Sequence, residues 1–62
     1  MDGGKAELEE LLTVSEVARW FRLKPKTVYD LVWRRRIPHV KLGRAVRFPR
    51  AALEQWLAER MR

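Results

Sequence analysis

The chain has 62 residues, of which 47% are hydrophobic and 35% are charged, and its formal net charge at pH 7 is +6. This length predicts one small domain, and the absence of cysteine excludes disulfides and thiolate metal sites. A single histidine and the lack of a carboxylate cluster argue against a metal site, and no apolar run approaches the roughly 20 residues that span a bilayer. We therefore expect a cytoplasmic domain with no cofactor and no membrane contact.

The positive charge is concentrated in the middle of the chain. Residues 1–18 carry five acids and one lysine, and residues 51–62 are neutral overall. Between them, residues 19–50 carry eleven lysines or arginines and a single acid, Asp30. Such a basic block is typical of a surface that binds phosphates. Charge alone leaves open the alternative of a solvated basic surface.

The N-terminal residues give the weakest structural signals. Residues 1–6 contain paired glycines and predict a flexible tail, followed by a single domain over residues 7–60. Residues 7–12 place three leucines on one helical face, so they could add a helical turn once docked.

Two helices separated by a short gap are predicted next. Thr13 and Glu16 have the spacing of a capping box, and Pro25 suits the first position of a helix. Because so tight a turn makes the two helices cross steeply, the pair predicts a helix-turn-helix. Apolar residues at helical spacing form the expected core stripes. These are Val14, Val17, Ala18 and Phe21 in the first helix, and Val28, Leu31 and Val32 in the second.

Residues 39–48 predict an antiparallel hairpin, in which apolar residues alternate with polar ones. A three-residue loop over residues 43–45 would bring the apolar residues to one face, whereas a shift by one residue would place His39 and Lys41 among them. We therefore expect the three-residue loop. The apolar face would hold Val40, Leu42, Val46 and Phe48, and the solvent face Lys41, Arg44 and Arg47.

Pro49 opens a last predicted helix, with an inner stripe of Ala52, Leu53, Trp56 and Leu57. The expected fold class is therefore mainly α with a small β-hairpin. The architecture is a winged helix-turn-helix: a helix-turn-helix, a two-stranded antiparallel wing and a C-terminal helix.

These elements contain residues that match a known family. They are Leu12-Thr13-Val14, Glu16-Val17-Ala18, Thr27-Val28-Tyr29, Leu31, Ile37-Pro38, Lys41, Gly43-Arg44, Arg47-Phe48, Leu53 and Trp56-Leu57. The pattern resembles the excisionase-family winged helix-turn-helix domain, a small relative of the MerR-type DNA-binding head. The resemblance implies sequence-specific binding of double-stranded DNA. It implies a role either as an excisionase, which sets the direction of recombination beside an integrase, or as a small transcription regulator.

Three positions depart from the family pattern. Arg22 and Arg35 stand where the family usually has glycine, and these glycines suit a left-handed backbone that costs other residues about 1 kcal/mol. Lys24 stands where the family prefers a serine-type N-cap, and a lysine there also opposes the helix dipole. The two arginines are expected to give up some stability in return for positive charge.

The second helix, over residues 25–35, is expected to enter the major groove with its N-terminal part toward the base edges. The wing, over residues 39–48, would lie at the minor groove or the backbone, where Arg44 suits a narrow minor groove. Arg34 could reach a phosphate or a guanine edge. The chain has no asparagine, and its one glutamine is in the last helix, so amide recognition of adenine is not expected. The candidate DNA-binding residues are Lys24, Lys26, Thr27, Tyr29, Asp30, Arg34, Arg36, Lys41, Arg44 and Arg47.

Two further aromatic side chains leave alternatives open. Tyr29 resembles the family's tyrosine, whose hydroxyl suits a phosphate oxygen, and half-buried packing is its alternative. Trp33 lies on the outward helix face and is expected to pack under the wing, with a DNA-backbone or protein contact as alternatives. His39 is expected to be a surface strand residue, with a phosphate contact as its alternative.

The functional alternatives belong to other classes. No serine is free to act as a nucleophile and no phosphate-binding loop is present, so the chain is not expected to be an enzyme. A protein-interaction or packaging adaptor, similar to the head of a terminase small subunit, would present Trp33 and the acidic residues 7–12 to a partner. RNA binding is disfavoured because the strands lack an aromatic platform. The expected partners are duplex DNA, an integrase or recombinase, and further copies of the chain binding cooperatively on DNA.

Overall fold

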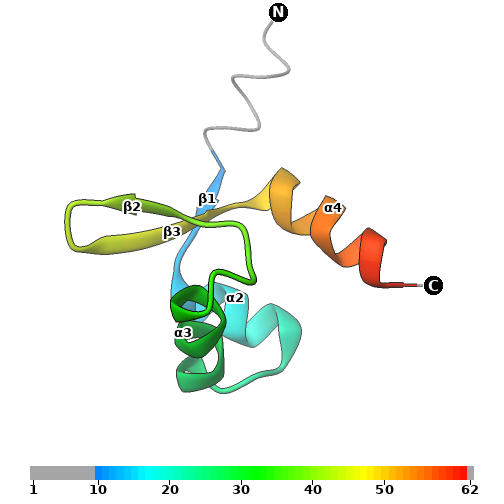
Figure 1. The fold of residues 1–62 in the computed structure, drawn as a ribbon, viewed down its shortest axis with the longest axis horizontal. Coiled ribbons are helices and arrows are strands. Elements are labelled where there is room, and N and C mark those ends of the chain that lie inside the picture. Colours follow the sequence, from blue (N-terminus) through cyan, green and yellow to red (C-terminus); the bar gives the residue numbers. More distant parts are fainter. Residues whose placement is uncertain (1–9, 62) are drawn as a thin grey trace, which may run out of the picture.

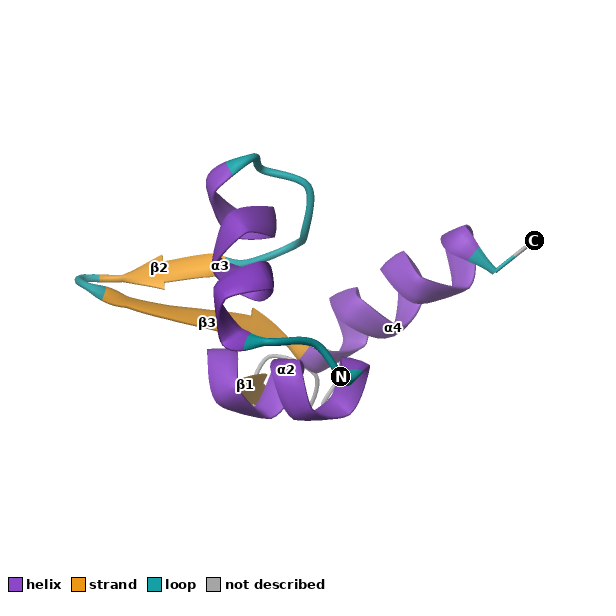
Figure 2. Ribbon diagram, turned by 90° about the horizontal axis from the view of Figure 1, so that it is seen from below, coloured by secondary structure: helices purple, strands orange, loops and turns teal. Residues whose placement is uncertain are grey.

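The computed structural model describes residues 10–61. In chain order these form β1 (Leu11–Leu12), α2 (Val14–Phe21), α3 (Pro25–Trp33), β2 (Val40–Leu42), β3 (Ala45–Pro49) and α4 (Arg50–Arg60). The α2–α3 pair lies against a small antiparallel sheet with strand order β1-β3-β2 (Figure 1). The hairpin and α4 leave the helix pair in opposite directions (Figure 2). This architecture confirms the expected fold class and adds one strand to the sheet.

The added strand corrects the prediction for residues 7–12. Leu11 and Leu12 pair with Pro49 and Phe48 instead of forming a helical turn. The Arg50 backbone N–H extends this ladder by donating to the carbonyl of Glu10 at 3.0 Å. A strand of two residues has no periodic pattern, so only its pairing with β3 defines it. Residues 7–9 of the predicted turn and the predicted tail over residues 1–6 lie outside the described residues.

Local signals place the starts of α2 and α3 as predicted. The Thr13 N–H donates to Glu16 Oε1 at 2.8 Å and the Glu16 N–H donates to Thr13 Oγ1 at 3.1 Å, which completes the capping box. Pro25 is the first residue of α3, and Lys24 is its N-cap. The Lys24 side chain makes no capping hydrogen bond. The start of α3 is therefore capped less well than that of α2.

An arginine in the left-handed backbone region follows each of the two helices, as the glycine preference at these positions implies. Arg22 has φ 59° and Arg35 has φ 55°. In each case the next residue reaches back five positions: Leu23 N–H donates to the Ala18 carbonyl at 2.8 Å, and Arg36 N–H donates to that of Leu31 at 2.9 Å. This is the Schellman pattern of helix termination, here built on arginine in place of glycine.

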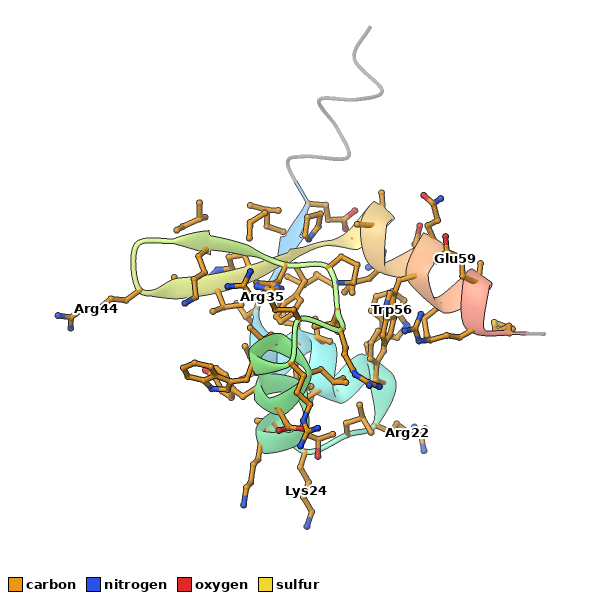
Figure 3. The ribbon with its side chains drawn as sticks, viewed as in Figure 1. Arg22, Lys24, Arg35, Arg44, Trp56 and Glu59 are labelled. Carbon is orange, nitrogen blue, oxygen red and sulfur yellow. The ribbon has the colours of Figure 1, made fainter. Side chains whose placement is uncertain are left out.

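The core forms where the helix pair, β3 and α4 meet. Its largest fully buried side chains are Phe48, Leu53, Val17 and Val28. Trp56 of α4 lies at the edge, stacked on Phe21 with the ring centroids 6.0 Å apart. Its indole Nε1 donates to the Arg36 carbonyl at 2.9 Å, so α4 holds the loop that follows α3 (Figure 3). The full set of buried residues is Val14, Val17, Ala18, Val28, Val32, Ile37, Phe48 and Leu53.

The hairpin register differs from the predicted one. Leu42 pairs with Ala45, so the loop has two residues, Gly43 and Arg44, instead of three. Gly43 has φ 65°. A two-residue hairpin loop with glycine first is typical of a type II′ turn, whose twist suits the flanking strands. Turn chemistry therefore selects the register, and the alternation of apolar residues does not.

The shifted register reverses the two faces of β2. Lys41 pairs with Val46 and shares the face that Phe48 extends into the core. Val40 and Leu42 turn to the other face, where they are 37% and 56% exposed. The predicted apolar face of four residues is therefore wrong for its β2 half. This half tolerates exposure because the hairpin extends beyond the body of the domain, where the core no longer selects a face (Figure 1).

Candidate nucleic-acid interface

Helix α3 presents two rows of exposed side chains at a spacing of four residues. One row is charged and consists of Lys26, Asp30 and Arg34, which is the residue after the helix. The other row is aromatic and consists of Tyr29 and Trp33, which are 47% and 80% exposed. Side chains four apart lie on one face of a helix. Helix α3 therefore offers a charged row and an aromatic row to a partner.

The aromatic row forms one wall of an open groove between α3 and the hairpin. The groove has a volume of about 590 Å³. Cations from the hairpin and from the end of α3 lie around it, and no acid lines it. Its lining residues are Tyr29, Val32, Trp33, Arg35, His39, Lys41, Arg44 and Val46. Aromatic and aliphatic surface surrounded by positive charge suits a ligand that combines an apolar body with an anion.

Trp33 and His39 differ from their predicted positions. Trp33 does not pack under the wing, because 80% of its surface is exposed. His39 precedes β2 and is half-buried at the groove wall, so it is not a surface strand residue. Its Nδ1 lies 2.8 Å from the Ile37 carbonyl, which can only accept, so Nδ1 carries the proton in this contact. The other ring nitrogen, Nε2, takes no part in this contact with the Ile37 carbonyl.

Sequence reasoning missed Arg35 and His39 as groove residues. The hairpin register is the signal that could have found them. With glycine at the first position of a two-residue loop, Lys41 turns toward α3, and the groove that Lys41 then lines also contains Arg35 and His39. Arg35 lies between α3 and the hairpin, and Arg44 extends from the hairpin tip (Figure 3). The groove is thus lined from both sides by basic residues.

Arg47 does not share a face with Lys41, contrary to the predicted solvent face. It pairs with Val40, one position along from the pair of Lys41 with Val46, and therefore points to the opposite side of the sheet. It is half-buried, and its Nη1 donates to the Val46 carbonyl at 2.9 Å. Of the three basic wing residues, only Lys41 and Arg44 line the groove.

The remaining candidate residues are exposed at α3 and its two ends. Lys24, Lys26 and Thr27 lie at the N-terminal end, and Lys24 points away from the domain (Figure 3). Arg34 and Arg36 follow the C-terminal end and are also exposed. Asp30 is not free, because its Oδ2 lies 3.0 Å from Arg34 Nε. The only acid in this part of the surface is therefore paired with a neighbouring cation.

The described residues show no sign of two other kinds of site. Within residues 10–61, no three His, Cys, Asp or Glu side chains gather where they could hold a metal ion. No helix in the same span is long and apolar enough to cross a membrane.

Comparison with known families identifies the architecture. Residues 11–61 match the family model described as a helix-turn-helix domain, and this match spans all six elements. Comparison with curated proteins and with solved structures gives no match. The helix-turn-helix is a DNA-binding motif whose second helix enters the major groove. Since the match covers most of its length, the chain belongs to the helix-turn-helix domain family.

Proposed function

We propose that this domain binds double-stranded DNA with α3 in the major groove and the hairpin tip at the neighbouring minor groove. The observation that carries the proposal is the charge of the surface that these elements form. It exposes seven cations and one acid, which is already paired. The cations are Lys24, Lys26, Arg34, Arg35, Arg36, Lys41 and Arg44. DNA binding by such a surface is driven by phosphate contacts and by counterion release.

Each part of the surface has a proposed role. Lys26 and Thr27 lie in the first turn of α3, the part that meets base edges in a helix-turn-helix, and Lys24 contacts a phosphate. The Tyr29 hydroxyl donates to a phosphate oxygen. Lys41 contacts the DNA strand that passes between α3 and the hairpin, and Arg44 enters the minor groove of the DNA. Arg47 is left out of this interface because it lies on the other face of the sheet.

The test is binding to a fluorescent duplex of about 24 base pairs of arbitrary sequence across a salt series. We expect affinity to fall steeply with salt, and Lys41→Ala and Arg44→Ala each to reduce the slope by about one unit. Arg47→Ala is the matched control, because it removes the same charge from the other face of the same hairpin. It should leave the slope almost unchanged. Absence of duplex binding at low salt, or an Arg47→Ala effect as large as that of Lys41→Ala, would contradict the proposal.

At a finer level, we propose an excisionase-type or transcription-regulator role, which rests on the family resemblance of the residue pattern. In either role, copies bound at adjacent sites would bend or organise the duplex. Gel-shift titration of a duplex with several sites should then show cooperative binding to these sites. The free protein should be monomeric. Bending measured by circular permutation of the site, with and without an integrase, separates the two roles.

The exposure of Trp33 favours a second candidate function, a protein-interaction adaptor. A tryptophan that is 80% exposed would suit a protein partner. This function predicts weak DNA binding and self-association that rises with concentration, and sedimentation of the free protein measures the latter. We favour DNA, because Trp33 lines a groove whose charged residues are all basic.

A further inference from the structure

We infer that Asp30 is a positioning residue that orients Arg34 to read a guanine in the major groove. This inference rests on the proposed DNA-binding function and deepens it, because it names the base pair that one position of α3 selects. The starting observation is the ion pair between Arg34 Nε and Asp30 Oδ2, at 3.0 Å. Asp30 is also the only acid within the basic block of residues 19–50. An acid at the centre of a phosphate-binding surface weakens binding unless it has another use.

The geometry of the pair defines that use. The closest approach is to Nε, on the inner side of the guanidinium, and both side chains stay more than half exposed, at 66% for Arg34 and 57% for Asp30. Nη1 and Nη2, on the outer side, are left for a partner. These two groups form the planar fork that donates to O6 and N7 of guanine. The carboxylate therefore restrains the arginine while its reading edge stays open.

The backbone keeps the two residues one helical turn apart. Arg34 is the C-cap of α3, and its N–H donates to the Asp30 carbonyl at 3.0 Å. Arg34 and Asp30 are thus joined by a backbone hydrogen bond and, through their side chains, by an ion pair. An arginine held this way loses less conformational freedom on binding than a free one. A free arginine can turn to the nearest phosphate, so removing Asp30 should convert a base contact into a backbone contact.

This conversion separates affinity from specificity, which makes it testable. Asp30→Ala removes a negative charge, so affinity for arbitrary duplex at low salt should rise, by roughly two- to fivefold. At the same time, the preference for guanine at one position should fall from on the order of 5- to 150-fold to nearly none. Arg34→Ala removes the guanidinium altogether, so the same preference should be lost. At position 30, alanine is used in place of asparagine because an asparagine side chain could itself recognise adenine.

Glu54→Ala is the matched control. Glu54 and Arg50 form another exposed carboxylate–arginine pair four residues apart, with Oε2 and Nε at 3.2 Å, but on α4. Its removal changes the net charge as Asp30→Ala does, without touching α3. Selection from a randomised duplex library is run on the parent and the three variants, beside the salt series on arbitrary duplex.

The expected result is a guanine preference in the parent and in Glu54→Ala that disappears in Asp30→Ala and Arg34→Ala. The inference is overturned if Asp30→Ala keeps the preference, if Glu54→Ala loses it, or if the parent selects no guanine. Failure of the proposed function itself is seen separately, as absence of parent binding to arbitrary duplex at low salt. Far-ultraviolet circular dichroism checks that each variant is folded, which we expect because the substituted side chains are exposed.

Discussion

At the scale of single residues, the domain accepts backbone strain at two arginines. Arg22 and Arg35 both adopt a left-handed backbone, which glycine takes up at no steric cost. The left-handed region costs other residues roughly 1–2 kcal/mol each, a large fraction of the stability of a small domain. Arg35 lines the groove, and Arg22 lies at the end of α2 (Figure 3). For Arg35, the charge that the strain retains therefore faces the proposed ligand.

Arg35→Gly should raise the melting temperature and weaken DNA binding. Relief of the left-handed strain should raise it by about 4 °C, because about 1 kcal/mol shifts a domain of this size by roughly 4–8 °C and glycine loses more entropy on folding. Thermal unfolding followed by circular dichroism and the salt series measure the two effects. Arg35→Ala is the control, since it removes the same charge and keeps the strain. A glycine variant less stable than the parent would refute this account.

At the scale of elements, what the sequence predicts depends on where each signal originates. The starts of α2, α3 and α4 were predictable because the Thr13–Glu16 box, Pro25 and Pro49 act within one turn. Strand β1 was not predictable, because a two-residue strand is defined by its partner β3. The predicted hairpin register was wrong because β2 lies beyond the core, so its apolar residues did not indicate which face of the strand is buried. Because of that error, the sequence did not predict the groove or the positions of Lys41 and His39 in its lining.

Lys24→Ser should strengthen α3 and weaken its proposed contact with phosphate. A serine hydroxyl at the N-cap would accept a backbone N–H that Lys24 leaves uncapped, worth about 1 kcal/mol. The lost charge should reduce the salt slope by about one unit. Lys26→Ser, which removes a lysine from inside the first turn, should reduce the slope without the gain in stability. Urea unfolding of both variants measures the difference, and equal stability of Lys24→Ser and the parent would count against it.

At the scale of the whole molecule, α4 stabilises the domain through contacts with distant parts of the chain. Leu53 is fully buried in the core, and Trp56 bonds to a carbonyl 20 residues earlier. Two arginines lie over the tryptophans of this region: Arg50 lies 5.1 Å from the ring centroid of Trp20, and Arg60 lies 4.1 Å from that of Trp56. Because the Arg36 carbonyl follows α3 directly, α4 restrains the loop that leads from α3 to the hairpin.

Trp56→Phe should therefore cost about 1 kcal/mol of stability, the typical net value of one hydrogen bond, besides the smaller ring. Amide exchange in the loop over residues 34–39 should speed up, since its link to α4 is lost. Trp20→Phe is the control, because Trp20 lies at the edge of the same aromatic group but, within residues 10–61, forms no side-chain hydrogen bond to this loop. If both variants changed loop exchange equally, the hydrogen bond would not be what restrains the loop.

The three tryptophans should also differ in their fluorescence emission. Trp20 lies beside Phe21, with the ring centroids 5.0 Å apart, and Trp56 stacks on the same ring, whereas Trp33 is 80% exposed. Solvent around an indole shifts its emission to longer wavelength and admits small quenchers such as acrylamide. The unlabelled protein should therefore carry a built-in optical reporter on α3. A ligand that fills the groove would shift the red component of the emission to shorter wavelength and protect it from quenching.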